Sequence, residues 1–285
     1  MKTSSNLVRD IRRYYTGQLE ALYGPEEANA MMMMLLEHYF GINRVKMALE
    51  PELRLSESEM LTVHFAVKDL LKNKPIQYVI GETEFCGMRF MVNENVLIPR
   101  PETEEMVEMI ATSPQYSILD IGTGSGCIAI SLAKLIPNSD VMAVDVSEKA
   151  LEVARKNAEA NGVNVHFVLD DILKPTTTEL IDNQFDIIVS NPPYVCESEK
   201  TEMRANVLDH EPSSALFVPD NDPLIFYRKI LEFAQKALKP DGQIWFEINE
   251  KFGKETAELC REKGFNNTEI IKDFRGKERV VRAQV

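Results

Sequence analysis

The chain has 285 residues, a formal net charge of −13 and a hydrophobic fraction of 44%, enough for one large or two ordinary domains with a real core. Residues 1–6 lack the apolar stretch of a signal peptide, no apolar run is long enough to cross a membrane, and the acidic balance argues against tight binding to duplex DNA. The 4 cysteines and 4 histidines show neither disulfide nor metal-ligand spacing, which predicts a metal-free protein of the reduced cytoplasm.

Residues 6 to about 73 predict a small helical bundle. Apolar residues recur at helical spacing in its first segment, namely Val8, Ile11, Tyr15 and Leu19. A second helix is expected over residues 26–39, where a run of methionines predicts a buried face, and a third over residues 56–72. Ser56 or Ser58 is the expected cap of this third helix.

A β-hairpin is predicted over residues 78–96. In this stretch apolar residues alternate along the chain, among them Phe85 and Phe90. Gly81 comes before these residues, and Gly87 interrupts the pattern. We therefore divide the chain into a helical bundle (1–74), a hairpin linker (75–98) and a larger domain (99–285). From Ser117 onward strands alternate with helices, which implies parallel strands in an open α/β sheet.

The next signal is a glycine-rich loop between a strand and a helix. The apolar strand 117–121 runs into the loop, and a segment with helical periodicity follows it. Glycine permits positive φ and close approach of a ligand to the backbone. The spacing G-x-G-x-G differs from dinucleotide and phosphate-loop motifs, so the loop alone is weak evidence. Its residues are Gly122, Thr123, Gly124, Ser125 and Gly126.

Acidic residues end the next two predicted strands. Strand 141–145 ends in Asp145, at a place where doubly wound folds bind ribose hydroxyls through an acid. Strand 164–169 leads into Asp171 and Ile172, where an adenine edge could lie. Asp145 has an alternative interpretation as an acid at the start of a helix, because Ser147 begins a clear helical pattern.

The most informative stretch is Asn191-Pro192-Pro193-Tyr194, which follows the buried strand 185–190. Asn191 offers a carbonyl acceptor, and the prolines fix φ without donating an N–H. The Pro192 carbonyl is then a free acceptor, and Tyr194 offers a flat face for stacking. This combination suits a planar –NH2 group on an sp2 carbon, although a proline-stiffened turn is the alternative.

The last predicted elements complete the sheet. A fifth strand is expected over residues 243–248 and a helix over 255–263, ending at Gly264. Residues 268–271 and 279–282 are expected to form a final antiparallel pair. Because ligands of such sheets bind at the carboxyl ends of the strands, the glycine loop, Asp145, Asp171 and Asn191 are predicted to meet there.

The chain resembles the class I S-adenosylmethionine-dependent methyltransferases in the order of its glycine loop, Asp145, Asp171 and Asn191–Tyr194. Within that class it resembles the release factor glutamine methyltransferases (the HemK/PrmC family). Residues 75–81, residues 96–104 and Glu211-Pro212 strengthen the resemblance, which covers most of the chain from about Pro75. It implies a Rossmann-like, seven-stranded sheet joined to the helical bundle through the hairpin. The sequence departs from the family pattern at Ile172, at Asn249 and in the loop 218–222.

The resemblance implies an enzyme that methylates the N5 nitrogen of the glutamine in the Gly-Gly-Gln motif of class I peptide chain release factors. S-Adenosyl-L-methionine would be the cofactor and S-adenosyl-L-homocysteine the product, with no metal. Asn191, Pro192 and Tyr194 would be catalytic, and Pro193 would join them in binding the acceptor. Gly122–Gly126, Asp145, Asp171, Ile172 and Asn191 would bind the cofactor. The bundle would recognise the partner, and the enzyme would act as a cytoplasmic monomer, without membrane or nucleic-acid substrate.

Three other interpretations compete with this one. An adenine-N6 methyltransferase would also bind an –NH2 group on an sp2 carbon, but it must flip a base and grip phosphates, and no basic stripe is visible. A methyltransferase for a glutamine of another protein would be chemically identical. A non-catalytic cofactor-binding module is disfavoured because both the glycine loop and Asn191–Tyr194 are intact.

Overall fold

The computed structural model describes residues 5–112 and 117–285. The chain divides into two compact units, the first of residues 1–81 with 205–210 and the second of residues 82–204 with 211–285. Residues 1–4, part of the stretch read for a signal peptide, lie outside the described ranges. Among the described helices, none has the length and apolar character needed to span a bilayer.

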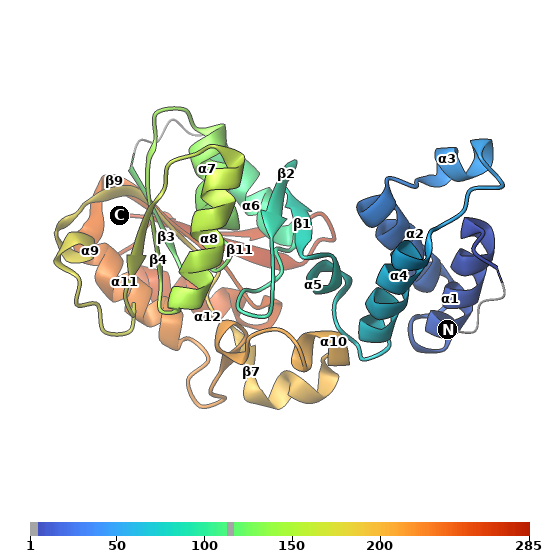
Figure 1. Ribbon diagram of the computed structural model, residues 1–285. Helices are drawn as coiled ribbons and strands as arrows, with labels where there is room; N and C mark the ends of the chain where they lie inside the picture. The colour runs from blue at the N-terminus through green and yellow to red at the C-terminus, as the bar shows by residue number, and fades with distance from the viewer. Residues whose placement is uncertain (1–4, 113–116) are drawn as a thin grey trace. The chain divides into compact units, whose positions relative to one another are not determined.

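The first unit is helical (Figure 1). Its elements are α1 (Val8–Tyr23), α2 (Pro25–Phe40), α3 (Arg44–Leu49), α4 (Glu57–Leu70), α5 (Ile76–Ile80) and the short α10 (Ala205–Leu208). The apolar residues of α1 predicted from spacing are all buried. Ser56, rather than Ser58, caps α4, since its side chain and that of Glu59 bond each other's backbone N–H.

Helix α2 shows how local signals bound a helix. Pro25 stands at its first position, and Gly41 ends it with φ 63° in the left-handed region. The methionine run is buried as predicted except for Met34, which is 42% exposed. Helices α3 and α5 were not predicted. Residues 76–80 form a helix that ends at Gly81 (φ 87°), so the predicted hairpin begins later than residue 78.

The observed hairpin consists of β1 (Glu82–Phe85) and β2 (Met88–Met91). Cys86 and Gly87 both have positive φ, 47° and 68°, which matches the twist of a tight two-residue turn. Phe85 and Phe90 pack edge to face on its buried side, with ring centroids 5.9 Å apart. The three-part division of the chain proposed from the sequence remains a prediction.

The second unit is built on a seven-stranded sheet of order β10-β11-β9-β6-β3-β4-β5, in which β9, β6, β3, β4 and β5 are parallel. This confirms the predicted class I methyltransferase fold, and β10 and β11 form the predicted antiparallel pair. The sheet strands are β3 (Ser117–Ile121), β4 (Asp140–Asp145), β5 (His166–Leu169), β6 (Phe185–Ser190), β9 (Leu238–Glu247), β10 (Glu269–Lys272) and β11 (Glu278–Gln284).

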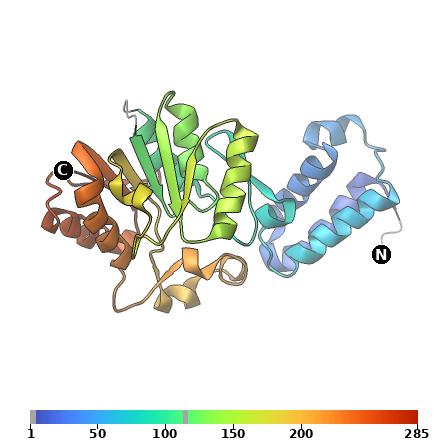
Figure 2. The same ribbon diagram turned by 60° about the vertical axis from the view of Figure 1, so that its left-hand side comes forward.

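Helices cover both faces of this sheet. One face packs on α6, α7 and α8 and the other on α9, α11 and α12; Figure 2 separates the orange α11 and α12 from the green strands. The remaining bounds are α6 (Pro101–Ala111), α7 (Cys127–Leu135), α8 (Glu148–Asn161), α9 (Thr178–Asp182), α11 (Ile225–Ala237), α12 (Gly253–Glu262), β7 (Val195–Cys196), β8 (Phe217–Val218) and the 3-10 turns Glu197–Glu202, Ser213–Ala215 and Glu250–Phe252.

Within the seven-stranded sheet, two strands start two or more residues away from the sequence prediction, and the other starts agree within one residue. β5 begins at His166 rather than residue 164, and β9 begins at Leu238 rather than residue 243. β9 runs through the predicted turn because its first residue pairs with Phe185 before the register shifts. Asp241 takes positive φ (64°) there, so the turn signal marks an irregularity in a strand rather than its start.

Asn157 of α8 joins the hairpin to the glycine loop. Its fully buried amide donates to the carbonyls of Met91 (3.0 Å) and Ser125 (2.9 Å) and accepts the Met91 N–H at 2.7 Å. An unpaired buried amide would be costly, so these bonds fix β2 and the loop against one another.

Candidate active site

A cleft opens at the carboxyl ends of β3, β4 and β6, where open parallel sheets bind ligands. Its cavity volume is about 310 Å³, the lower end of the range for small-molecule sites. It brings together eight residues predicted from the sequence, namely Gly122, Gly124, Asp145, Asp171, Ile172, Asn191, Pro192 and Pro193. Thr123, Ser125, Gly126 and Tyr194 do not line it.

The glycine loop turns sharply at the end of β3. Gly122, Gly124 and Gly126 have φ of 75°, 55° and 82°, which other residues adopt only with strain. Around Gly122 and Gly124 a side chain would meet nothing within 4 Å, whereas at Gly126 it would come within 2.8 Å of Ile130 and 3.1 Å of Ala154. The first two glycines therefore open the floor of the cleft, and Gly126 lets α7 pack on α8.

Buried Asp120 holds this loop from beneath. Its Oδ2 accepts the Thr123 hydroxyl at 2.6 Å and the Ala129 N–H at 3.2 Å. Burial raises the pKa of this carboxyl to about 7, against the two hydrogen bonds that lower it. Within the described ranges its Oδ1 has no hydrogen-bond partner. Thr123 thus acts on the loop's underside rather than in the cleft.

Asp145 stands at the end of β4 and lines the cleft. Its Oδ2 accepts the Gly124 N–H and its Oδ1 the Ser147 N–H, each at 2.9 Å. Burial raises the pKa of the carboxyl, and the N–H groups of Ser147 and Gly124 oppose that shift. Each carboxylate oxygen retains acceptor capacity. The two interpretations of Asp145 are compatible, because it both bonds the start of α8 and faces the cleft.

The loop after β5 supplies the next wall. Asp170 accepts the backbone N–H of Thr176 and Thr177, at 2.9 and 2.8 Å. Burial would raise its pKa, but these backbone bonds hold the pKa below its usual value. Asp171 accepts the Leu173 N–H at 2.9 Å through one oxygen. Ile172 adds an apolar, 8% exposed surface beside it.

Asn191 and Pro192 line the opposite side of the cleft. The Asn191 Nδ2 donates to the Thr103 hydroxyl at 3.4 Å. In the described parts of the chain, no group donates to Asn191 Oδ1 or to the Pro192 carbonyl. Two free acceptors therefore lie side by side in the chain at the cleft, as the sequence suggested.

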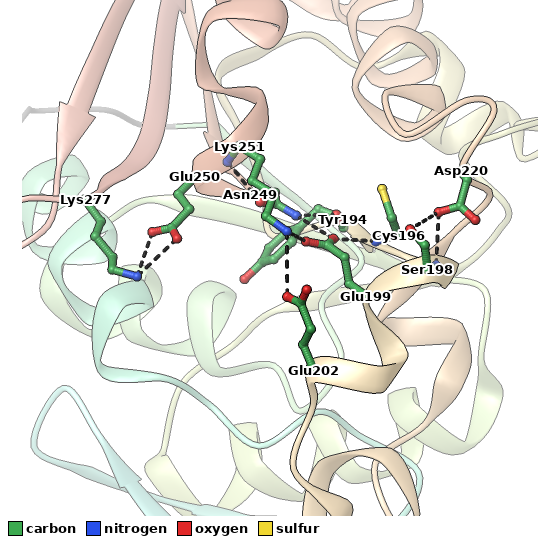
Figure 3. A network of polar contacts seen from close by, with 10 residues as sticks. All are labelled: Tyr194, Cys196, Ser198, Glu199, Glu202, Asp220, Asn249, Glu250, Lys251 and Lys277. Carbon is green, nitrogen blue, oxygen red and sulfur yellow. Dashed lines mark hydrogen bonds and ion pairs between the residues drawn. The ribbon is translucent and has the colours of Figure 1, made fainter.

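Tyr194 points away from the cleft into a polar network. Its hydroxyl donates to Glu247 Oε1 at 3.0 Å, and its backbone carbonyl accepts the Asn249 Nδ2 at 3.2 Å. Glu199 contacts both Asn249 and Lys251 (Figure 3), and its carboxylate oxygens lie 3.1 Å from Asn249 Nδ2 and 2.5 Å from Lys251 Nζ. The residues after β9 thus hold the segment that follows Pro193.

Sequence reasoning gave no role to Thr103, Glu211 or Glu247. Glu211 is 5% exposed and accepts the Ile98 N–H at 3.2 Å and Arg100 Nη2 at 2.6 Å. Through these bonds Glu211 links two segments that line the cleft, residues 94–97, which come earlier in the sequence, and residues 212–215, which follow it directly. An acid before a proline was visible in the sequence, but its partner lies 111 residues away. Among the described residues, no group of three or more His, Cys, Asp or Glu could hold a metal ion.

Comparisons with known proteins agree with this geometry. Residues 112–280 match a methyltransferase domain family and residues 10–81 the PrmC N-terminal domain family. The chain is 47% identical to a release factor glutamine methyltransferase of Flavobacterium psychrophilum, over 97% of this chain and 98% of the relative. One of Bacteroides thetaiotaomicron is 44% identical, over 96% and 98%.

The fold is similar to that of a solved methyltransferase from Pyrococcus furiosus. That structure is 21% identical in sequence, with a TM-score of 0.52, and the match covers 80% of this chain and 98% of that one. This similarity concerns the fold of the chain alone.

Proposed function

The chain belongs to the release factor glutamine methyltransferase family, and on that premise we propose that its cleft methylates a glutamine side-chain amide. The acceptor is the glutamine of the Gly-Gly-Gln motif in class I peptide chain release factors, and N5 is the methylated atom. One observation carries this proposal: Asn191 Oδ1 and the Pro192 carbonyl are free acceptors in the same cleft as Asp145 and the glycine loop.

The residues present fit S-adenosylmethionine at the other side of the cleft. Gly122 and Gly124 leave open space above the backbone, Asp145 can accept from ribose hydroxyls, and Asp171 with Ile172 suits an adenine ring and its amino edge. We call these residues the cofactor end, and Asn191–Tyr194 the acceptor end. When bound, this cofactor would supply an electrophilic methyl group and leave as S-adenosylhomocysteine, and the methylated nitrogen would then release one proton to water.

The acceptor end acts on an amide nitrogen that is a poor nucleophile, because its lone pair is delocalised into the carbonyl. Asn191 Oδ1 and the Pro192 carbonyl accept hydrogen bonds from its two N–H groups. These bonds strengthen as the nitrogen becomes partly cationic, so they stabilise the transition state more than the ground state. Holding the reacting groups in line contributes most, since well-oriented reactions gain roughly 7–11 kcal/mol.

Tyr194 supports the acceptor end from behind. Because its hydroxyl and carbonyl are both bonded away from the cleft, we assign it the role of fixing the backbone after Pro193.

In the proposal the protein is a cytoplasmic monomer that needs no metal, and its first unit contacts the release factor away from the glutamine. A chelator should therefore leave the methylation rate unchanged; loss of activity restored by a divalent ion would contradict this.

The function is tested with purified protein, labelled S-adenosylmethionine and two acceptors side by side, an unmethylated release factor and an adenine-containing duplex. Peptide mass spectrometry should find one added methyl group on the Gly-Gly-Gln glutamine. Label in the duplex and none in the factor would favour the adenine-N6 alternative.

A further inference from the structure

Glu247 is a buried acid that the chemistry above does not use. It ends β9, is 1% exposed, and has hydrogen bonds at both carboxylate oxygens. Thr103 Oγ1 donates to Oε2 at 2.5 Å, and the Tyr194 hydroxyl donates to Oε1 at 3.0 Å. Its backbone carbonyl accepts the Tyr227 hydroxyl at 3.0 Å. Burying a carboxylate costs free energy unless the charge is paired and hydrogen-bonded. The chain therefore keeps a glutamate here in spite of an energetic cost.

The direction of these hydrogen bonds follows from the chemistry of the groups. An ionised carboxylate only accepts, so the single hydrogen of the Thr103 hydroxyl must point to Glu247. The Thr103 oxygen is then left with lone pairs for its other neighbour. That neighbour is Asn191, whose Nδ2 lies 3.4 Å away. With Nδ2 turned to Thr103, the Asn191 carbonyl oxygen is the atom left for the cleft.

We propose that Glu247 is a positioning residue that makes Asn191 present its carbonyl oxygen, rather than its amide nitrogen, to the acceptor amide. The oxygen and the nitrogen of the Asn191 amide are nearly equivalent in shape. Without the relay of hydrogen bonds from Glu247 through Thr103 to Asn191, either atom could therefore face the cleft. The nitrogen would place an N–H donor against the –NH2 group of the substrate, where only an acceptor helps. The inference rests on the proposed function, since it concerns the acceptor that Asn191 binds.

Neighbouring groups favour the ionised, accepting form of the Glu247 carboxyl without cancelling the effect of its burial, so its pKa stays above the usual value. Burial raises the pKa of its carboxyl, while the hydrogen bonds from Thr103 and Tyr194 and the charge of Arg279 oppose that shift. Arg279 is itself fixed, because its Nε lies 3.3 Å from Asp273 Oδ2. The same hydrogen bonds that Glu247 uses to orient its neighbours thus help it to remain ionised.

The test compares two substitutions of Thr103 in the full-length protein. Thr103→Val removes the hydroxyl but keeps the shape, and Thr103→Ser keeps the hydroxyl. Thr103→Val should lower kcat on the release factor about 10–100-fold, as loss of a residue that orients a ligand commonly does. Its affinity for S-adenosylmethionine should stay within about twofold because the cofactor end is untouched, and the loss on the factor should appear in kcat more than in KM because the Asn191 hydrogen bond strengthens in the transition state. Thr103→Ser should retain most of the wild-type kcat.

Glu247→Gln tests the relay from its other end. A glutamine amide can donate to Thr103, which frees the Thr103 hydrogen for the Asn191 oxygen and so favours the wrong orientation. Adding Thr103→Val to Glu247→Gln should lower kcat by no more than about twofold further, since residues that act in one chain are not additive. If the Glu247 variant does not fold, the Thr103 pair alone decides.

A second readout does not depend on activity. In nitrogen-labelled protein, the side-chain amide signal of Asn191 should shift in Thr103→Val and stay in place in Thr103→Ser. Undiminished kcat in Thr103→Val, or an unmoved Asn191 signal, would overturn the inference while leaving the proposed function intact. If the wild-type protein methylated no glutamine in this assay, the proposed function would fail, and this inference with it.

Discussion

Asp145, at the cofactor end of the cleft, is held by backbone N–H groups only 2 and 21 residues away in the chain. Asn191, at the acceptor end, is held by the side chain of Thr103, 88 residues away, which in turn is bonded to Glu247, 144 residues away. The cofactor end is therefore organised by local backbone geometry. The acceptor end depends on side chains that the fold brings together, so each of its parts can be changed with little effect on the backbone.

Asn191→Ala should separate the two ends most strongly. It removes one of the two acceptors for the substrate amide, and loss of one such group typically lowers kcat about 10²–10³-fold. The affinity for S-adenosylmethionine, measured by calorimetry, should fall far less than turnover because Asp145 and the glycine loop are untouched. Near-normal turnover on the release factor would contradict the assigned mechanism.

Asp145→Asn should act on the other end alone. It keeps the size of the side chain but removes the charge that accepts from ribose hydroxyls, and hydrogen bonds to charged groups contribute about 1.5–3 kcal/mol. The Kd for S-adenosylmethionine should rise by at least about tenfold. At saturating cofactor, kcat should stay near the wild-type value. A large fall in kcat with unchanged Kd would show that the two ends are not separable.

Gly126→Ala should destabilise the cofactor end rather than its ligand contacts. The added carbon would approach Ile130 to 2.8 Å and Ala154 to 3.1 Å, and overpacking of this kind costs about 1–3 kcal/mol. Gly276→Ala is the matched control, because its φ of 79° is similar and nothing lies within 4 Å. Urea unfolding should show the larger loss in Gly126→Ala; equal losses would attribute the effect to φ alone.

The smallest predicted effect is a pH dependence of cofactor binding. Because burial raises the pKa of Asp145, this carboxyl takes up a proton at a higher pH than an ordinary aspartate. A protonated carboxyl loses acceptor capacity, so affinity should fall as the pH drops through that raised pKa. Calorimetry of the wild-type protein against Asp145→Asn isolates this group from Asp120 and the neighbouring acids. An identical pH profile in both proteins would exclude the effect.

The same contrast explains what could be predicted from the sequence. The glycine loop, Asp145 and the strand ends are encoded by neighbours in the chain, so spacing alone predicted that they would meet in one cleft. Thr103 lies in the first turn of α6, where its sequence neighbours explain it as part of a good helix start. Nothing local indicates that its hydroxyl reaches Glu247.

The misplaced bounds also have physical causes. Residues 76–80 lie next to the alternating pattern of the hairpin, but Pro75 and Gly81 bound them as a short helix. The turn signal near Asp241 lies inside β9 because pairing with β6 continues across it. The first bound was thus set by a neighbouring proline and glycine, and the second by pairing with a strand distant in the sequence.

The bonds of Asn157 to Met91 and Ser125 have a consequence for hydrogen exchange. The Met91 amide is bonded to a side chain, so its exchange with solvent requires Asn157 to release it. The same side chain also holds the carbonyl of Ser125 in the glycine loop. A ligand that steadies the loop should therefore slow exchange at Met91, a residue that does not line the cleft. A single amide on the hairpin would then report occupancy of the cleft without a label.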